Sequence, residues 1–215
     1  MQIISHRCET LSAIHAAATY DVAYIEFDIR YTKNNKIVVY HNDKTPSGKT
    51  IAHITLKALQ REVEDTCELA PALVACGNRP ALVESKSKGT IARSLPELKK
   101  NHRAAVASFH ADEILAARIN LPSHKTFLLQ RYHPFGIIRK ALNVDAHGIG
   151  LNKNWILLFP YYYNQAQKNE LAIYTYTVNN LWLGRRLQAL FKKLFICTDY
   201  PHKFTKTTPA SSTKS

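Results

Sequence analysis

The chain has 215 residues and a formal charge of +13, with 29 lysine and arginine residues against 16 acidic residues. Hydrophobic residues make up 46% of the chain and charged residues 21%, which is typical of a globular protein, and no apolar run is long enough to span a bilayer. The positive charge favours an anionic partner, namely phosphate esters, an acidic membrane surface or nucleic acid, but the basic residues are spread over several runs.

Short apolar or β-branched runs predict eight strands, separated by stretches compatible with helices. In chain order, the strands are expected at 2–6, 23–29, 80–86, 104–109, 125–130, 146–152, 171–178 and 194–199. Amphipathic stretches predict helices within 9–21, 55–65, 94–102, 111–120 and 180–193. Asn34 and Asn35 predict the turn of an additional hairpin after the second strand.

Alternation of strands and helices implies parallel β-α units. Eight such units favour a (β/α)₈ TIM barrel, α/β in class, as a single domain over residues 1–201. A doubly wound open sheet is the alternative, because its periodicity is the same. The Ser/Thr/Lys-rich end of the chain predicts a disordered tail over 202–215. The first residues lack the pattern of a secretory signal, which favours a cytoplasmic location.

Two carboxylates stand in a strand that otherwise has the pattern of a buried one. Glu26 and Asp28 are two residues apart, so their side chains project on the same face, opposite Ile25 and Phe27. Two like charges this close repel each other and are costly to desolvate. The pattern therefore predicts a cation between them, whereas salt bridges to nearby basic groups are the simpler alternative.

In a barrel, the carboxyl ends of the strands converge on one mouth. The polar residues expected there, besides Glu26 and Asp28, are His6, Arg7, His41, Glu84 and Lys86. Carboxylate oxygens suit Mg²⁺ or Ca²⁺, and Glu84 is the expected third ligand. Glu84 and Lys86 share a face, so a simple ion pair between them is the alternative.

Six motifs resemble, in order, those of the glycerophosphodiester phosphodiesterase family. They are SHRCET (5–10), YIEFDIRYTKNNKIVVYHND (24–43), LVESK (82–86), VASF (106–109), YTYTVNN (174–180) and ICTDYP (196–201). The resemblance covers nearly the whole chain and ends before the tail. Its most specific part is the ordered set His-Arg, Glu-x-Asp, His and Glu-x-Lys.

The resemblance implies a TIM barrel that hydrolyses glycerophosphodiesters to glycerol 3-phosphate and an alcohol with a divalent metal ion. Carried over by position, the metal ligands are Glu26, Asp28 and Glu84, the acid/base pair is His6 and His41, and the phosphate is held by Arg7 and Lys86. The resemblance also implies a supporting role for Glu9 near the metal and for Tyr176, which stands where a Trp is usual. Further departures are Cys8 in place of Gly and Asn42 in place of Asp, together with a short insertion between the second and third strands.

Other functions remain open at this point. A related phospholipase D-type enzyme would act on lysolipid head groups, and the aromatic run NWILLFPYYYN (154–164) is compatible either with such a head group or with a lid over the barrel. A non-catalytic barrel that binds anions or membranes is the alternative of a different class. No specific nucleic-acid partner is expected, while peripheral contact with an anionic membrane is compatible with the charge. The sequence leaves the oligomeric state open.

The four cysteines show no spacing of a zinc site, which predicts reduced, buried thiols. Cys8 follows His6 closely enough to suggest a nucleophile, but a small residue in a tight turn is the favoured interpretation.

Overall fold

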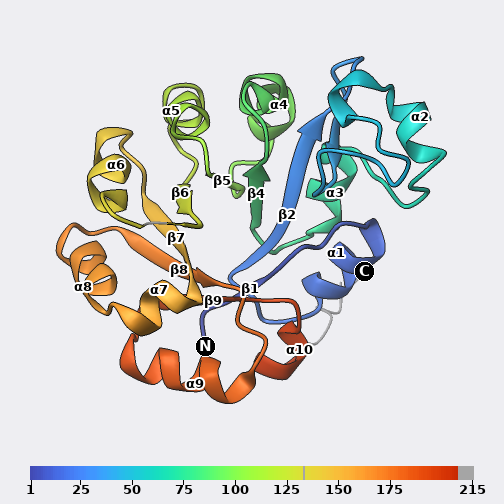
Figure 1. Ribbon diagram of the computed structural model, residues 1–215. Helices are drawn as coiled ribbons and strands as arrows, with labels where there is room; N and C mark the ends of the chain where they lie inside the picture. The colour runs from blue at the N-terminus through green and yellow to red at the C-terminus, as the bar shows by residue number, and fades with distance from the viewer. Residues whose placement is uncertain (133, 208–215) are drawn as a thin grey trace, which may run out of the picture.

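A computed structural model describes residues 1–132 and 134–207 of the chain. Its parallel strands form a closed barrel of eight, which Figure 1 shows at the centre of the molecule. The barrel strands are β1 Ile3–Ser5, β2 Tyr24–Tyr31, β4 Ala81–Ser85, β5 Ala105–Ser108, β6 Thr126–Gln130, β7 Gly148–Asn152, β8 Ala172–Tyr176 and β9 Leu194–Thr198. Because β1 pairs with both β2 and β9, the ring of eight parallel strands is closed, and the predicted TIM barrel is confirmed over the open sheet.

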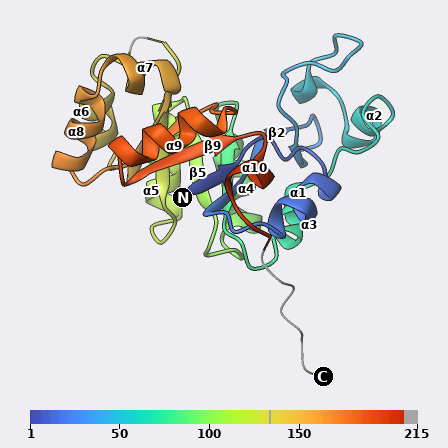
Figure 2. The same ribbon diagram turned by 90° about the horizontal axis from the view of Figure 1, so that it is seen from below.

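Helices surround the barrel as a ring (Figure 1). They are α1 Leu11–Ala18, α2 Leu56–Gln60, α3 Leu69–Ala75, α4 Thr90–Leu98, α5 Ala111–Asn120, α6 Ile137–Asn143, α7 Lys153–Leu158, α8 Tyr161–Lys168, α9 Leu181–Leu190 and α10 Pro201–Phe204, with a 3₁₀ turn at Ile51–His53. Figures 1 and 2 both place α2 at the periphery, beyond the end of β2. Within the described ranges, no helix is long and apolar enough to cross a membrane.

The predicted hairpin is present next to the barrel. Strand β3 Ile37–Val39 pairs antiparallel with the end of β2. At the turn, Asn35 has a φ of 56° and its backbone N–H donates to the Thr32 carbonyl oxygen at 2.9 Å. Asparagine tolerates this left-handed conformation better than most residues, which explains why the Asn-Asn pair marks the turn.

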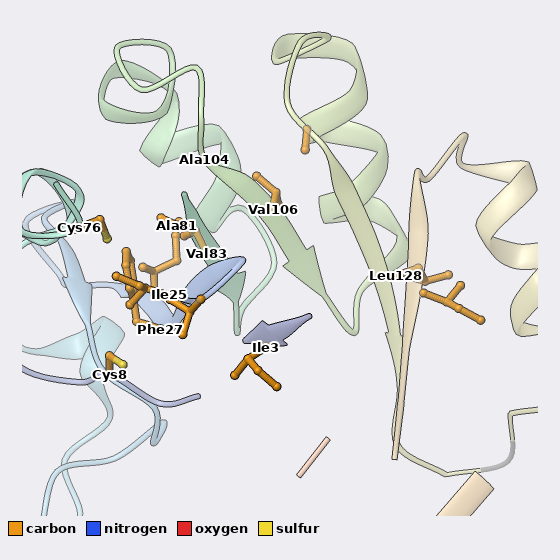
Figure 3. Packing of buried hydrophobic residues seen from close by; sticks show 14 of the residues in the cluster. Ile3, Cys8, Ile25, Phe27, Cys76, Ala81, Val83, Ala104, Val106 and Leu128 are labelled. Carbon is orange, nitrogen blue, oxygen red and sulfur yellow. The ribbon is translucent and has the colours of Figure 1, made fainter. Parts of the chain in front are cut away.

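The alternating faces of the strands produce two separate apolar clusters. One packs the outside of the barrel against the helices, and Figure 3 shows Ile25, Phe27, Ala81 and Val83 of β2 and β4 packed together in it. The other fills the interior and consists of Ile4, Tyr24, Leu82, Ala105, Ala107, Phe127, Leu129, Tyr174 and Cys197. Glu26 and Asp28 share the interior parity of Tyr24, as the sequence pattern predicted.

Helical structure and packing contacts continue past residue 201, where the barrel domain was predicted to end. Helix α10 crosses that boundary, and Phe204 is buried against α9, where an added Cβ on Gly184 would overlap its ring. Thr207 forms a bridge with Tyr20. The burial of Phe204 anchors this segment to the barrel, and residues 208–215 of the predicted tail lie outside the described residues.

Strand β7 contributes glycine to the crowded interior. A Cβ on Gly148 would lie 2.5 Å from the Ala172 carbonyl oxygen and 2.7 Å from the Phe127 ring. The backbones and the ring therefore approach closely only because Gly148 has no side chain.

We expect Gly148→Ala to lower the free energy of unfolding by about 1–3 kcal/mol, because strand β8 or the Phe127 ring must move to admit the methyl group. Urea unfolding followed by circular dichroism measures the change. Val74→Ala is the control, since Val74 is 80% exposed on α3. Unchanged stability of Gly148→Ala would contradict the close approach.

Candidate active site

Polar side chains replace apolar ones on the interior face where the strands approach the barrel mouth. The change occurs over a spacing of two residues, which keeps the side chains on the same face. It is seen from Ile4 to His6, Tyr24 to Glu26, Leu82 to Glu84 and Cys197 to Asp199. The barrel thus has an apolar interior that ends in a ring of chemically reactive groups.

Glu26, Asp28 and Glu84 form a buried carboxylate cluster. One oxygen from each lies within 4.8 Å of the others, and the three residues are only 2%, 1% and 7% exposed. The register of the sheet accounts for this, because Asp28 on β2 is directly paired with Glu84 on β4. The three predicted metal ligands are therefore brought together.

The Lys86 ammonium lies against this cluster. Its Nζ is 2.6 Å from Glu84 Oε1 and 3.0 Å from Asp28 Oδ1. The ion pair between Glu84 and Lys86, considered as the alternative to a metal site, is thus present, but it coexists with the carboxylate cluster and does not replace it. Phe109 also packs near this lysine, with its ring centroid 5.8 Å from Nζ.

One ammonium group leaves the cluster with an excess of negative charge. Burial, reinforced by the neighbouring carboxylates, raises the pKa of Glu26 well above its usual range and that of Glu84 to about 7. Glu26 Oε1 and Asp28 Oδ2 are buried without a hydrogen-bond partner in the described chain. Unpartnered carboxylate oxygens at this separation fit a hard divalent cation.

His6 is oriented by a carboxylate from the opposite end of the chain. Its Nδ1 donates to Asp199 Oδ1 at 2.6 Å, and Asp199 Oδ2 accepts from Asn179 Nδ2 at 2.6 Å. The bond from His6, together with that from Asn179, lowers the pKa of Asp199 and keeps it ionised. With Nδ1 engaged, His6 directs Nε2 toward Glu26, whose Oε2 is 3.9 Å away.

His41 lies after β3 and is held by a different set of contacts. Its Nδ1 and Asn42 Oδ1 are 3.1 Å apart. Its carbonyl oxygen accepts two hydrogen bonds from Arg30, at 3.1 Å from Nε and 2.9 Å from Nη2, and Arg30 also donates to Ser87 Oγ at 3.0 Å. Burial lowers the pKa of His41, so this imidazole is largely neutral at neutral pH.

Arg7 supports the site through its backbone as well as its side chain. It has a φ of 54°, and its N–H donates to Glu26 Oε2 at 2.7 Å. Its guanidinium pairs with Glu9, with Nε 3.0 Å and Nη2 2.9 Å from Oε1. Glu9 therefore contacts Arg7 and is not a member of the carboxylate cluster.

A cavity of about 230 Å³ opens at the barrel mouth, and its polar lining includes His6, Arg7, Glu26, His41, Glu84 and Lys86. Its aromatic wall includes Phe109, Tyr174 and Tyr176, and Arg131 lies at its edge. Tyr176 Oη donates to the Gln130 carbonyl oxygen at 3.1 Å, and its ring meets that of Phe109 edge-on. The polar and aromatic sides together provide a place for a small anionic molecule with an apolar portion.

Sequence reasoning missed several residues of this site, although the signal was present. All but Asn179 continue the interior parity of their strands, and Asn179 lies three residues beyond the end of β8. The missed residues are Phe109, Arg131, Tyr174, Asn179 and Asp199, together with Arg30, which braces His41.

The run that contains α7 and α8 divides between core and surface. Ile156 and Tyr162 are buried, whereas Leu158 is 68% and Tyr161 62% exposed. The segment thus packs partly as core, and its exposed side chains lie on the surface.

The cysteine thiols are buried and are not suited to act as nucleophiles. All four are free and buried. Cys8 fills the turn after β1, with Sγ 3.3 Å from Ser5 Oγ, and burial raises the pKa of its thiol to about 12. A thiol that remains protonated is a poor nucleophile, which favours the structural interpretation of Cys8.

The fold and the site define a (β/α)₈ barrel with a buried acidic cluster and two histidines at its mouth. Residues 5–99 match the sequence model of the "Glycerophosphoryl diester phosphodiesterase family". This match supports the family resemblance predicted from the motifs over residues 5–99, which contain all three clustered carboxylates and both histidines. No curated protein sequence matches the chain.

Solved structures of glycerophosphodiester phosphodiesterases share the fold over nearly the whole chain. A phosphodiesterase from Oleispira antarctica, in complex with the product sn-glycerol-3-phosphate, is 18% identical, with a TM-score of 0.83 over 95% of each chain. The enzyme from Thermotoga maritima is 18% identical, with a TM-score of 0.80 over 94% of this chain and 96% of the other. A putative member from Galdieria sulphuraria is 21% identical, with a TM-score of 0.77 over 94% of this chain and 95% of the other.

We expect the native cysteines to react slowly with a thiol reagent such as DTNB at pH 8, because the pKa values of Cys8 and Cys76 are both about 12 and the side chains are buried. Absorbance at saturation should give four thiols after unfolding in urea. Rapid reaction of one thiol in the native protein, assigned to Cys8 by its absence in Cys8→Ser, would contradict this result.

We expect the His41 imidazole to titrate below the ordinary value of about 6.5, because burial disfavours its charged form. Histidine-ring NMR of the protein in EDTA measures the midpoint, and His41→Ala assigns the resonance. The histidines of the urea-unfolded chain provide the reference. A midpoint equal to or above that reference would show that burial does not control this group.

Proposed function

We propose that the chain is a metal-dependent phosphodiesterase that hydrolyses glycerophosphodiesters to glycerol 3-phosphate and an alcohol. The observation that carries the proposal is the buried carboxylate cluster next to two separately oriented histidines at the barrel mouth. The family match supports the reaction class, and the Oleispira antarctica structure, which holds sn-glycerol-3-phosphate, supports the product.

Glu26, Asp28 and Glu84 would hold the divalent ion, and Mg²⁺ or Ca²⁺ suits their oxygen atoms. When bound, such an ion supplies positive charge next to the phosphoryl oxygens. It would also offset the repulsion that raises the pKa values of Glu26 and Glu84.

Arg7 and Lys86 are two of the protein cations that border the same cavity, and Arg131 is the third. Their charges would bind the anionic phosphodiester and stabilise the additional charge of the transition state. Glu9 holds the Arg7 guanidinium in place, and Tyr176 provides part of the apolar wall against which carbon atoms of the substrate can pack.

His6 and His41 would perform the proton transfers. One imidazole accepts the proton of the attacking oxygen, which belongs to water or to the neighbouring hydroxyl of the glycerol. As the bond between phosphorus and the departing oxygen breaks, the other imidazole donates a proton to that oxygen. Asp199 and Asn42 act as positioning residues, because each contacts the Nδ1 atom and leaves Nε2 for the reaction.

We expect the purified protein to release glycerol 3-phosphate from glycerophosphodiesters, and EDTA to abolish the release until Mg²⁺ or Ca²⁺ is restored. His41→Ala should lower kcat on the order of 10²–10⁴-fold, because it removes one proton transfer. A coupled glycerol 3-phosphate assay measures both effects. His15→Ala, an exposed substitution on α1, is the matched control and should retain full activity.

Two outcomes would contradict this proposal. Turnover of micellar lysolipid without turnover of soluble glycerophosphodiesters would assign the site to a phospholipase D-type reaction. Absence of turnover on both, with salt-sensitive binding to anionic vesicles, would indicate a non-catalytic barrel.

A further inference from the structure

A second cavity, of about 350 Å³, opens beside the first. The two share His41, Lys86, Phe109 and Arg131 as a common wall. A molecule bound in the first cavity can therefore extend past this wall into the second without leaving the barrel mouth.

The second cavity is predominantly cationic. Arg30, Lys86 and Arg131 border it, against the single carboxylate of Asp43. Lys86 is committed to the carboxylate cluster, and Arg30 donates to the His41 carbonyl oxygen and to Ser87. These two cations are therefore already engaged by the protein.

Arg131 is different, because within residues 1–132 and 134–207 it forms no ion pair. Among the described residues, its guanidinium lies over the Tyr132 ring, 5.6 Å from the centroid. Arg131 follows β6 with the interior parity of Phe127 and Leu129, which explains its place at the junction of both cavities. A guanidinium in this state is suited to pair with an oxyanion in two parallel hydrogen bonds.

We propose that the second cavity binds the head group of the phosphodiester and that Arg131 selects head groups with a second anionic group, a phosphate or a carboxylate. This inference rests on the proposed function. A cationic head group such as choline would meet three cations here. The Phe109 ring, the aromatic surface next to this cavity, already faces the Lys86 ammonium.

Three soluble substrates that differ in head-group charge test the assignment. They are 1,3-bis(glycerophospho)glycerol, with a second phosphate, glycerophosphoglycerol, with a neutral polyol, and glycerophosphocholine, with a cation. We expect kcat/KM, measured per scissile end by release of glycerol 3-phosphate, to be highest for the first substrate and lowest for the third.

Arg131→Gln should lower kcat/KM for the doubly anionic substrate about tenfold, as expected for loss of a charged hydrogen bond, and change the neutral one by less than about twofold. Arg131→Lys should retain part of the preference. Arg139→Gln is the matched control, because Arg139 is exposed on α6 outside both cavities. The substitution removes the same charge as Arg131→Gln. The Arg139→Gln variant should show the same preference among the three substrates as the unmodified protein.

The outcomes distinguish failure of the head-group assignment from failure of the proposed function. If Arg131→Gln lowers kcat/KM equally for all three substrates, Arg131 binds the glycerophosphate part that they share, and the head-group assignment is overturned. If Arg139→Gln loses the preference for the doubly anionic substrate to the same extent, the preference comes from the net charge of the protein, and the head-group assignment is again overturned. Hydrolysis with a preference for choline overturns the inference alone, whereas no hydrolysis of any substrate overturns the proposed function with it.

Discussion

Three buried carboxylates lie together, and the single Lys86 ammonium pairs with only two of them, Asp28 and Glu84; this imbalance of charge governs the candidate site. Burial raises the pKa values of Glu26 and Glu84, because desolvation disfavours their ionised forms. Lys86 offsets only part of the repulsion. A cluster of this kind has an affinity for added positive charge, and it would repel an anionic phosphodiester without it. Under the proposed function, cation binding and substrate binding would be two consequences of the same arrangement.

The barrel supplies this arrangement through the period of its strands. Interior side chains are apolar in the middle of the barrel and become polar two residues later, at the mouth. Apolar packing below therefore fixes the direction of the reactive groups above. Gly148 on β7 is part of this apolar packing, because its missing side chain leaves room for the Phe127 ring in an interior that has no space for another methyl group.

The two histidines depend on partners that are distant in the chain or carried by other loops. Asp199 lies 193 residues from His6, and the two meet because β1 pairs with β9 when the barrel closes. Arg30 joins the His41 segment to Ser87 in the loop after β4. Asn42, one of the departures from the family pattern, still provides an oxygen for His41 Nδ1, so this departure retains the orienting contact.

The sequence by itself determined the strand pattern, the barrel class, the Asn-Asn hairpin and the acidic cluster, because each follows from the local period of side chains or from the spacing of a motif. Short helices such as α3 and α7 escaped prediction, since tertiary packing and not amphipathic length stabilises them. Tertiary structure alone decided that Asp199 orients His6, that Phe204 extends the domain, and that Arg131 joins two cavities. These contacts link residues far apart in the chain, and only closure of the barrel sets the distances between them.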